Sequence, residues 1–446
     1  MSLFSAIRSR IHNAHPDHHA IARSMVWVAV FVLLGSIARA AREIAIAYRY
    51  GVSAEVDAYL FVFNLVNWPV GVWFSILTVI LVPLAASIRQ AGLTELPRFR
   101  SELFGLALML GLILAFLGWL GLPLLLNSSW AGLSANTATI ATLMVPTLAL
   151  LAPLGVLVSL CSAWMLAAGR HSNTMLESVP ALVLLLALFA FPGGGVQPLV
   201  WGTLVGFACH LISLITILAR QGEIEAPRLT QQSTQWPAFW HGFGIMLVGQ
   251  ALMSLTTIVD QFFAAHLGTG AIATLSYANR ILTLILGVGA MMVSRATLPI
   301  FSESHVHDGK QLHRVAGQWA GFLFVLGVIA MISGWWLASW GVRLFFERGA
   351  FTADDAEAVA AVFRYGLPQL PFYFAGLVLV SLLVSQRRYR AISVIGVINL
   401  VVKIISSALM VPSLGVGGLM VSSTVMLGIS CLLLIAVVAG KILKEK

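Results

Sequence analysis

Long apolar stretches recur along nearly the whole chain, and they limit its possible folds more than any other feature. Each stretch is long enough to cross the roughly 30 Å of bilayer hydrocarbon as a helix. Only 10% of the 446 residues are Asp, Glu, Lys or Arg, against about 25% in an ordinary soluble domain. The mean hydropathy is +0.94. We therefore predict an all-α, polytopic membrane protein.

Twelve apolar runs of spanning length predict twelve transmembrane helices. Their ranges are 22–49, 56–88, 102–126, 138–168, 174–192, 198–220, 238–266, 271–301, 314–345, 356–386, 389–411 and 414–440. Lys and Arg gather in every second connection and in the C-terminal tail, whereas the intervening connections carry almost none. By the positive-inside rule, both termini are cytoplasmic.

The second six helices repeat the first six in the same orientation. Acidic, glycine and proline positions of the first half return 216 to 218 residues later, namely Glu43 as Asp260, Gly51 as Gly268, Gly71 as Gly287, Pro83 as Pro299 and Pro153 as Pro371. An even number of crossings per repeat makes both halves face the same way. The predicted division is a cytoplasmic tail at 1–24, a six-helix lobe at 25–220, a polar cytoplasmic linker at 221–237, a second lobe at 238–440 and a cytoplasmic tail at 441–446.

Charged side chains inside the predicted helices indicate a functional site. Each such charge costs roughly 2.5 to 3.5 kcal/mol and needs a partner or a watery cavity. Arg39, Arg42 and Glu43 share one face of the first helix, and Asp57 begins the second helix. Two guanidiniums near one carboxylate leave surplus positive charge, which suits a phosphate or a diphosphate. A purely structural salt bridge is the alternative for Glu43.

The second half adds Asp260, Arg280, Arg364 and Lys403 within its helices. Charges from both halves, facing the seam between them, predict a cationic central cavity. Arg364 lies near a helix end, so contact with lipid headgroups is its alternative role. A structural ion pair is the alternative for Asp260.

Missing motifs exclude several function classes. The sequence lacks GxxxxGK[ST] and GxSxG, so we expect a transporter, not an enzyme, and no cofactor. The net charge of +9 comes from short connections and not from a basic patch interleaved with aromatic residues, so nucleic acid is not an expected partner. Four histidines near the N-terminus lack the companion ligands of a closed zinc site, so no metal is expected.

Four stretches resemble the MurJ/MviN lipid II flippases of the MOP superfamily. They are REIAIAYRYGVSAEVDAYLFVFNLVN at 42–67, LSYANRILTLILGVGAMMVSRATLPIFSE at 275–303, LFFERGAFTADDAEAV at 344–359 and VINLVVKIISSALMVPSLGVGGL at 397–419. The resemblance implies a V-shaped, MATE-like bundle in the bacterial inner membrane. It also implies transport of an undecaprenyl-diphosphate-linked saccharide to the outer leaflet by alternating access. Membrane lipids and glycan-synthesis proteins are the other partners that it implies.

The resemblance places Arg42, Asp57 and Arg280 on charged cavity positions of the family, with Glu43 where an Asp is usual. Two features depart from it. Val70 stands where the family has a cavity arginine, and the chain has twelve predicted helices where fourteen are typical. Twelve is the usual count in the related Wzx-type O-antigen and exopolysaccharide flippases, so lipid II, O-antigen and exopolysaccharide units all stay open.

Two other function classes also stay open. A MATE-type exporter of small molecules, coupled to an ion, has the same architecture, although its cavity favours cations through acidic residues. Here basic residues outweigh acidic ones in the predicted cavity, which favours an anionic head group. A non-transporting scaffold of a glycan-synthesis complex would leave these charges dispensable.

Two further predictions concern the second half. Some relatives carry an acid on helix 7 and an Asn with an acid four residues on in helix 11, a cluster that resembles a sodium site. Here Asn399 and Lys403 occupy the helix 11 positions, so we expect Lys403 to pair with Asp260 and replace the ion. Pro368 and Pro371 remove backbone donors from the tenth helix, so they are candidate hinges for closure.

Overall fold

The computed structural model describes residues 16–90, 95–169, 175–193, 195–304, 309–386 and 388–444. Most of the predicted N-terminal tail, including its first histidines, lies outside this range. All regular structure in the described residues is helical: α2 (Pro16–Tyr50), α3 (Ala54–Gln90), α4 (Glu95–Leu126), η1 (Ser129–Ala131), α5 (Ala135–Leu148), α6 (Leu151–Ala167), α8 (Val179–Ala190), α9 (Gln197–Arg220), α10 (Trp236–Ala265), α11 (Ala271–Ser304), α12 (Gly309–Phe346), α13 (Ala353–Gly366), α14 (Gln369–Ser385), α15 (Tyr389–Leu414) and α16 (Val416–Lys444).

The twelve predicted crossings coincide with these helices in order. Seven described helices are long and apolar enough to span a bilayer, and two bent pairs raise the number to nine. The shorter apolar segments Val179–Ala190 and Ala271–Gly287 lie at the predicted fifth and eighth crossings, and α2 lies at the first. The fold is therefore the predicted all-α polytopic bundle.

The fourth and tenth crossings differ from prediction because each is broken into two helices. The pair α5 and α6 bends by 51°, and the pair α13 and α14 bends by 43°. Pro153 lies in the first turn of α6, and Pro368 directly precedes α14. Proline lacks the N–H that would continue the helical hydrogen bonds, so each helix restarts at a new angle.

Both bends are held by the same contact, which supports the internal repeat. A Cβ added to Gly111 of α4 would lie 2.5 Å from the Cα of Pro153, and one added to Gly327 of α12 would lie 2.5 Å from the Cα of Pro371. No side chain fits at these two glycines. In each half, a long straight helix therefore packs backbone to backbone against the bend.

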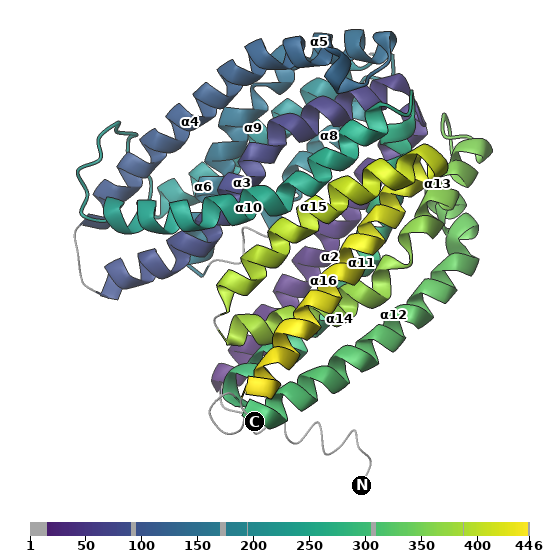
Figure 1. Ribbon diagram of the computed structural model, residues 1–446. Helices are drawn as coiled ribbons and strands as arrows, with labels where there is room; N and C mark the ends of the chain where they lie inside the picture. The colour runs from purple at the N-terminus through teal and green to yellow at the C-terminus, as the bar shows by residue number, and fades with distance from the viewer. Residues whose placement is uncertain are drawn as a thin grey trace.

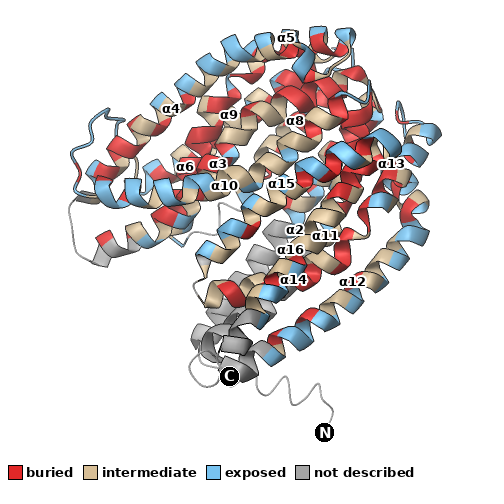
Figure 2. Ribbon diagram, viewed as in Figure 1, coloured by how far each residue is buried: buried red, intermediate tan, exposed pale blue. Residues whose placement is uncertain are grey.

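The two halves converge at one end of the bundle and diverge toward the other, where α2 begins and α16 ends (Figure 1). Buried residues concentrate where the halves meet (Figure 2). One hydrophobic core crosses this junction, with Phe61 of α3 against Phe262 of α10 at a ring-centroid distance of 5.3 Å. The outward faces of α4 and α12 expose apolar side chains such as Phe116 and Trp336, as expected of surfaces that contact lipid.

The predicted linker is docked on the first half of the protein. Glu102 of α4 is 1% exposed, and its carboxylate accepts hydrogen bonds from the amides of Gln232 and Ser233 and from the indole of Trp236 at 2.7 Å. Trp236 also packs edge to face on Phe99. The first turns of α10 therefore belong to the core of the first half, although α10 begins the second repeat.

Candidate functional site

Three of the predicted site residues meet where the halves converge. Glu43 of α2 forms an ion pair with its neighbour Arg42, and the same carboxylate oxygen lies 3.4 Å from a guanidinium nitrogen of Arg280 on α11. The Glu43 side chain is 12% exposed, Arg42 is 21% exposed and Arg280 is 43% exposed. One carboxylate is thus shared by two guanidiniums from opposite halves, and the cluster carries a net positive charge.

This arginine cluster, defined as Arg42, Glu43 and Arg280, keeps unused donor capacity. The Nε of Arg42 is buried and has no hydrogen-bond partner among the described residues. A buried donor without a partner costs about 1 to 3 kcal/mol, so a ligand that accepts this hydrogen bond gains affinity. The Arg280 side chain is 43% exposed, so a ligand can reach it. The cluster therefore keeps donors for an anion with several oxygens in addition to those that contact Glu43.

Arg39 lies one turn before the arginine cluster on α2 and is exposed. Its guanidinium donates to the Ser36 hydroxyl at 3.1 Å. No ion pair between Arg39 and the cluster is present in the described part of the chain. Its position extends positive charge along α2 toward the end where the halves diverge.

Asp57, in the first turn of α3, is 1% exposed. Its two carboxylate oxygens accept hydrogen bonds from the amides of Gly270 and Ala273, the latter at 2.7 Å. These amides open α11, where a negative charge also interacts favourably with the helix dipole. No ion pair between Asp57 and the arginine cluster is present among the described residues, and the predicted contact of Asp57 with substrate stays a prediction. It positions the helix that carries Arg280.

Further contacts close the junction beside Asp57. The amide of Ala350 donates to the carbonyl of Tyr48 at 2.8 Å, and the hydroxyl of Tyr277 donates to the carbonyl of Gly51 at 3.2 Å. A Cβ on Gly349 would lie 2.3 Å from the carbonyl oxygen of Tyr48, so the two backbones touch. The protein is therefore closed at this end, opposite to the side where α2 begins and α16 ends, which is predicted to be cytoplasmic.

Lys403 and Asp260 form an ion pair inside the second half, with Nζ and Oδ1 2.7 Å apart. Lys403 is 1% exposed and donates three hydrogen bonds to α16: to the carbonyl of Leu419 at 2.9 Å and to the hydroxyls of Ser422 at 2.9 Å and Ser423 at 2.6 Å. Together with the oxygen of Asp260, these acceptors share the three ammonium protons among four oxygens. The ammonium thus lies among four oxygens, an environment that resembles a monovalent cation site.

This oxygen cage corrects the predicted surroundings of Lys403. Lys403 is predicted from the sequence to face the central cavity, but its side chain is enclosed by α10, α15 and α16. Asn399, one turn earlier, bonds Ser430 at 3.2 Å and does not reach the ion pair. The serines of α16 were missed because single hydroxyls are common in membrane helices. The adjacent pair Ser422 and Ser423, facing a lysine, was the available signal.

Arg364 also lies outside the predicted cavity. Its guanidinium donates to Glu357 at 3.1 Å and to the hydroxyl of Ser339 on α12 at 2.7 Å. Contact with lipid headgroups is therefore not needed to satisfy this charge. The network joins α12 to α13 on the outer surface of the second half.

Three other positions singled out in the sequence lie in the core of the first half or at a helix bend of the second half. Val70 is 5% exposed, and a Cβ on Gly155 would approach its Cγ1 to 2.8 Å, so Val70 lies in the core of the first half. Pro368 and Pro371 lie at the bend between α13 and α14. Their role as hinges stays a prediction.

The chain matches the family model described as "Lipid II flippase MurJ" over residues 46–444. It belongs to the MurJ family. The probable lipid II flippase MurJ of Bdellovibrio bacteriovorus is 28% identical over 252 residues, which are 55% of this chain and 47% of that protein. The lipid II flippase MurJ of Burkholderia cenocepacia is 23% identical over 440 residues, 90% of this chain and 80% of that protein.

This chain spans about half the length of the Bdellovibrio protein. A probable lipid II flippase MurJ of Helicobacter pylori is 29% identical over 44% of this chain and 43% of that protein. Solved structures share the fold. A MurJ flippase in an inward closed conformation has a TM-score of 0.80 at 19% identity, covering 93% of this chain and 87% of that one. An inward-facing MATE multidrug transporter has a TM-score of 0.73 at 15% identity, covering 92% and 94%.

The family and the fold agree with the predicted class. MurJ is described as a family of lipid II flippases, and as a member of it the chain is a multi-pass protein of the bacterial inner membrane. The MATE likeness concerns the fold, as the shared two-lobed architecture predicts.

Proposed function

We propose that this protein moves an undecaprenyl-diphosphate-linked saccharide of the lipid II class from the cytoplasmic to the outer leaflet by alternating access. The observation that carries the proposal is the arginine cluster, in which Arg42 and Arg280 approach one carboxylate from opposite halves. Family membership supports the same substrate class. In this proposal the two lobes correspond to 25–220 and 238–440, with the linker between them.

The proposed mechanism follows from competition for guanidinium donors. Glu43 holds Arg42 and Arg280 near each other while no substrate is bound. A diphosphate offers more oxygens and more negative charge than one carboxylate, and guanidinium groups bind such oxygens through paired hydrogen bonds. When the diphosphate takes over these bonds, the link between α2 and α11 through Glu43 weakens, which favours separation of the halves at the closed end.

Asp57 has a positioning role in this mechanism. It holds the first turn of α11, and Arg280 lies on the same helix. We assign Asp57 to closure of the outer side instead of direct contact with substrate. Arg39 supports capture of the anionic head group as it approaches along α2, because it adds positive charge on the side where the halves diverge.

The contacts of the acidic residues argue against the alternative function of a MATE-type exporter of cationic small molecules. Glu43 is engaged by two arginines, Asp57 by main-chain amides and Asp260 by Lys403. None of these three carboxylates is free to bind a cationic drug. The scaffold alternative predicts that the cluster is dispensable, so the same mutants test it.

Substitution of the two arginines tests the proposed function. Arg42→Ala or Arg280→Ala should abolish complementation of a flippase-deficient strain and substrate flipping in proteoliposomes at unchanged membrane levels. Arg→Lys variants should recover only part of the activity, because a point charge lacks the paired geometry. Arg343→Ala is the matched control, since that arginine is 54% exposed and lies on the outer part of α12. Normal activity of both alanine variants would rule the proposal out.

A further inference from the structure

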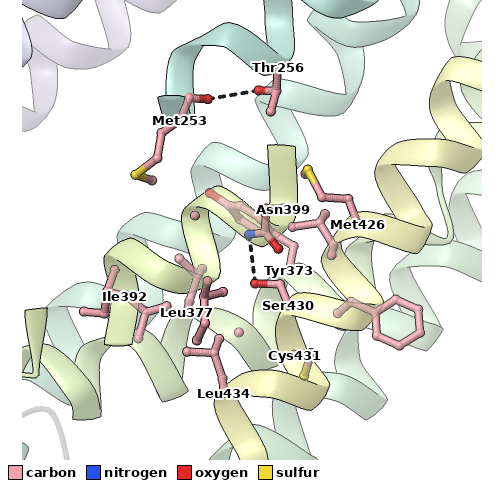
Figure 3. Close-up of a pocket in the computed structure, with 16 residues that line it drawn as sticks. Met253, Thr256, Tyr373, Leu377, Ile392, Asn399, Met426, Ser430, Cys431 and Leu434 are labelled. Carbon is pink, nitrogen blue, oxygen red and sulfur yellow. Dashed lines mark hydrogen bonds between the residues drawn. The ribbon is translucent and has the colours of Figure 1, made fainter. Parts of the chain in front are cut away.

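A cavity of about 300 Å³ lies inside the second half, between α10, α14, α15 and α16 (Figure 3). It is separate from the arginine cluster, which lies on α2 and α11. Sixteen residues line it, and none of them is charged. Most are aliphatic or aromatic, including Leu377, Ile392 and Leu434. A pocket of this volume and composition is within the range of small-ligand sites.

The cavity has one polar end. Asn399 donates from Nδ2 to the hydroxyl of Ser430 at 3.2 Å, while its Oδ1 is buried and has no partner among the described residues. Turning the amide over would exchange the two atoms, and one of them would still lack a partner. An unmet buried amide atom is costly, so this end of the cavity favours a ligand with one uncharged hydrogen-bonding group.

The rest of the cavity wall consists of flexible sulfur-containing side chains and of glycines that leave space. Met253, Met426 and Cys431 provide polarisable sulfur atoms that fit irregular apolar ligands. Gly376 has no atom within 4 Å of where a Cβ would stand, and the nearest atom to such a Cβ on Gly396 is in Met253 at 3.6 Å. The cavity therefore depends in part on glycines where larger side chains would occupy the space.

The charges nearest the polar end already satisfy each other. Thr256 and Asn399 line the cavity one helical turn before Asp260 and Lys403, which form the buried ion pair. A charged ligand would find no counter-ion on the cavity wall and would lose its hydration. Phosphodiester and carboxylate head groups are thereby disfavoured, whereas a neutral amphiphile matches both the apolar wall and the single amide.

We propose that this cavity binds the hydrocarbon chain of a neutral bilayer lipid, with an uncharged hydroxyl or amide at the chain's end bonded to Asn399. The lining helices cross the membrane, so the surrounding bilayer supplies such chains. The chain of the transported lipid is a less suitable occupant, because its diphosphate would have to leave α2 and α11. The site is therefore distinct from the proposed substrate site.

Photolabelling of the purified full chain in detergent tests this site. The probe is a long-chain alcohol that carries a diazirine, and adducts are located by mass spectrometry. Adducts should map to the lining segments of α15 and α16. Gly376→Leu should lower labelling about tenfold, which corresponds to lost contact with about two methylene groups. Gly321→Leu on exposed α12, which also has no atom within 4 Å of a Cβ, should leave labelling unchanged.

A second variant keeps the proposal testable if Gly376→Leu does not fold. Asn399→Leu should weaken labelling by the alcohol and leave labelling by the matching diazirine alkane unchanged. Equal labelling of the native chain and both cavity variants would overturn the proposal. Competition by undecaprenyl diphosphate as strong as that by the unlabelled alcohol would assign the cavity to the substrate chain and would also overturn it. Because binding is measured without transport, these outcomes are independent of the arginine tests.

Discussion

Removing the ammonium of Lys403 should harm the protein more than removing both charges of the ion pair. The side chain is 1% exposed, lies 2.7 Å from Asp260 and donates three hydrogen bonds to α16. Lys403→Ala leaves the carboxylate of Asp260, whose side chain is 18% exposed, without a counter-ion. Breaking a buried pair in this way typically costs about 3 to 5 kcal/mol of unfolding free energy.

The double variant isolates the interaction between the two charges. Adding Asp260→Asn to Lys403→Ala removes the uncompensated charge, so we expect it to restore part of the loss, with a coupling free energy of about 2 to 3 kcal/mol. Unfolding in mixed micelles with increasing SDS, followed by circular dichroism, measures these differences. Arg343→Ala serves as the control, because its exposed pair with Glu347 should contribute about 1 kcal/mol or less.

The same pair predicts the ion dependence of transport. An ammonium fixed among four oxygens occupies the place that a monovalent cation would need, so flipping in proteoliposomes should be the same in sodium and in choline buffers. A proton gradient is then the expected energy source for transport. Clear stimulation by sodium would refute the reasoning, and so would equal destabilisation of the single and double variants at Lys403 and Asp260.

Two further predictions concern motion between the halves. Replacing Pro368 and Pro371 together with Ala should straighten the 43° bend and hold the protein in one state, seen as lost alternation in cysteine accessibility from the two sides; unchanged alternation would leave the prolines with a packing role only. Asp57→Asn should weaken the closed end by about 1 kcal/mol through loss of a charge at the start of α11. The yield of a disulfide between cysteines placed at Tyr48 and Ala350, whose backbones are in contact, should fall, and an unchanged yield would contradict a gating role for Asp57.

Much of the architecture could be predicted because its signals are local. The apolar runs, the charge of the connections and the recurrence of Pro153 as Pro371 are visible in the sequence, and the structure confirms the order of the helices. The sequence did not predict that the fourth and tenth crossings are broken, because proline in a membrane helix is compatible with several geometries. Only packing of Gly111 and Gly327 against the two prolines selects one of them.

The sequence by itself determined the membrane class and the two six-helix halves. It also determined that Arg42 and Glu43 share a helix face and that each buried charge needs a partner. These features follow from hydropathy and helical spacing, which act within one segment. Tertiary structure alone decided which partner each charge received. Asp57 accepts hydrogen bonds from amides at the start of α11, and Lys403 donates hydrogen bonds to hydroxyls of α16. Such pairings depend on the rotation and relative height of neighbouring helices, which are set by side-chain packing between segments far apart in the chain.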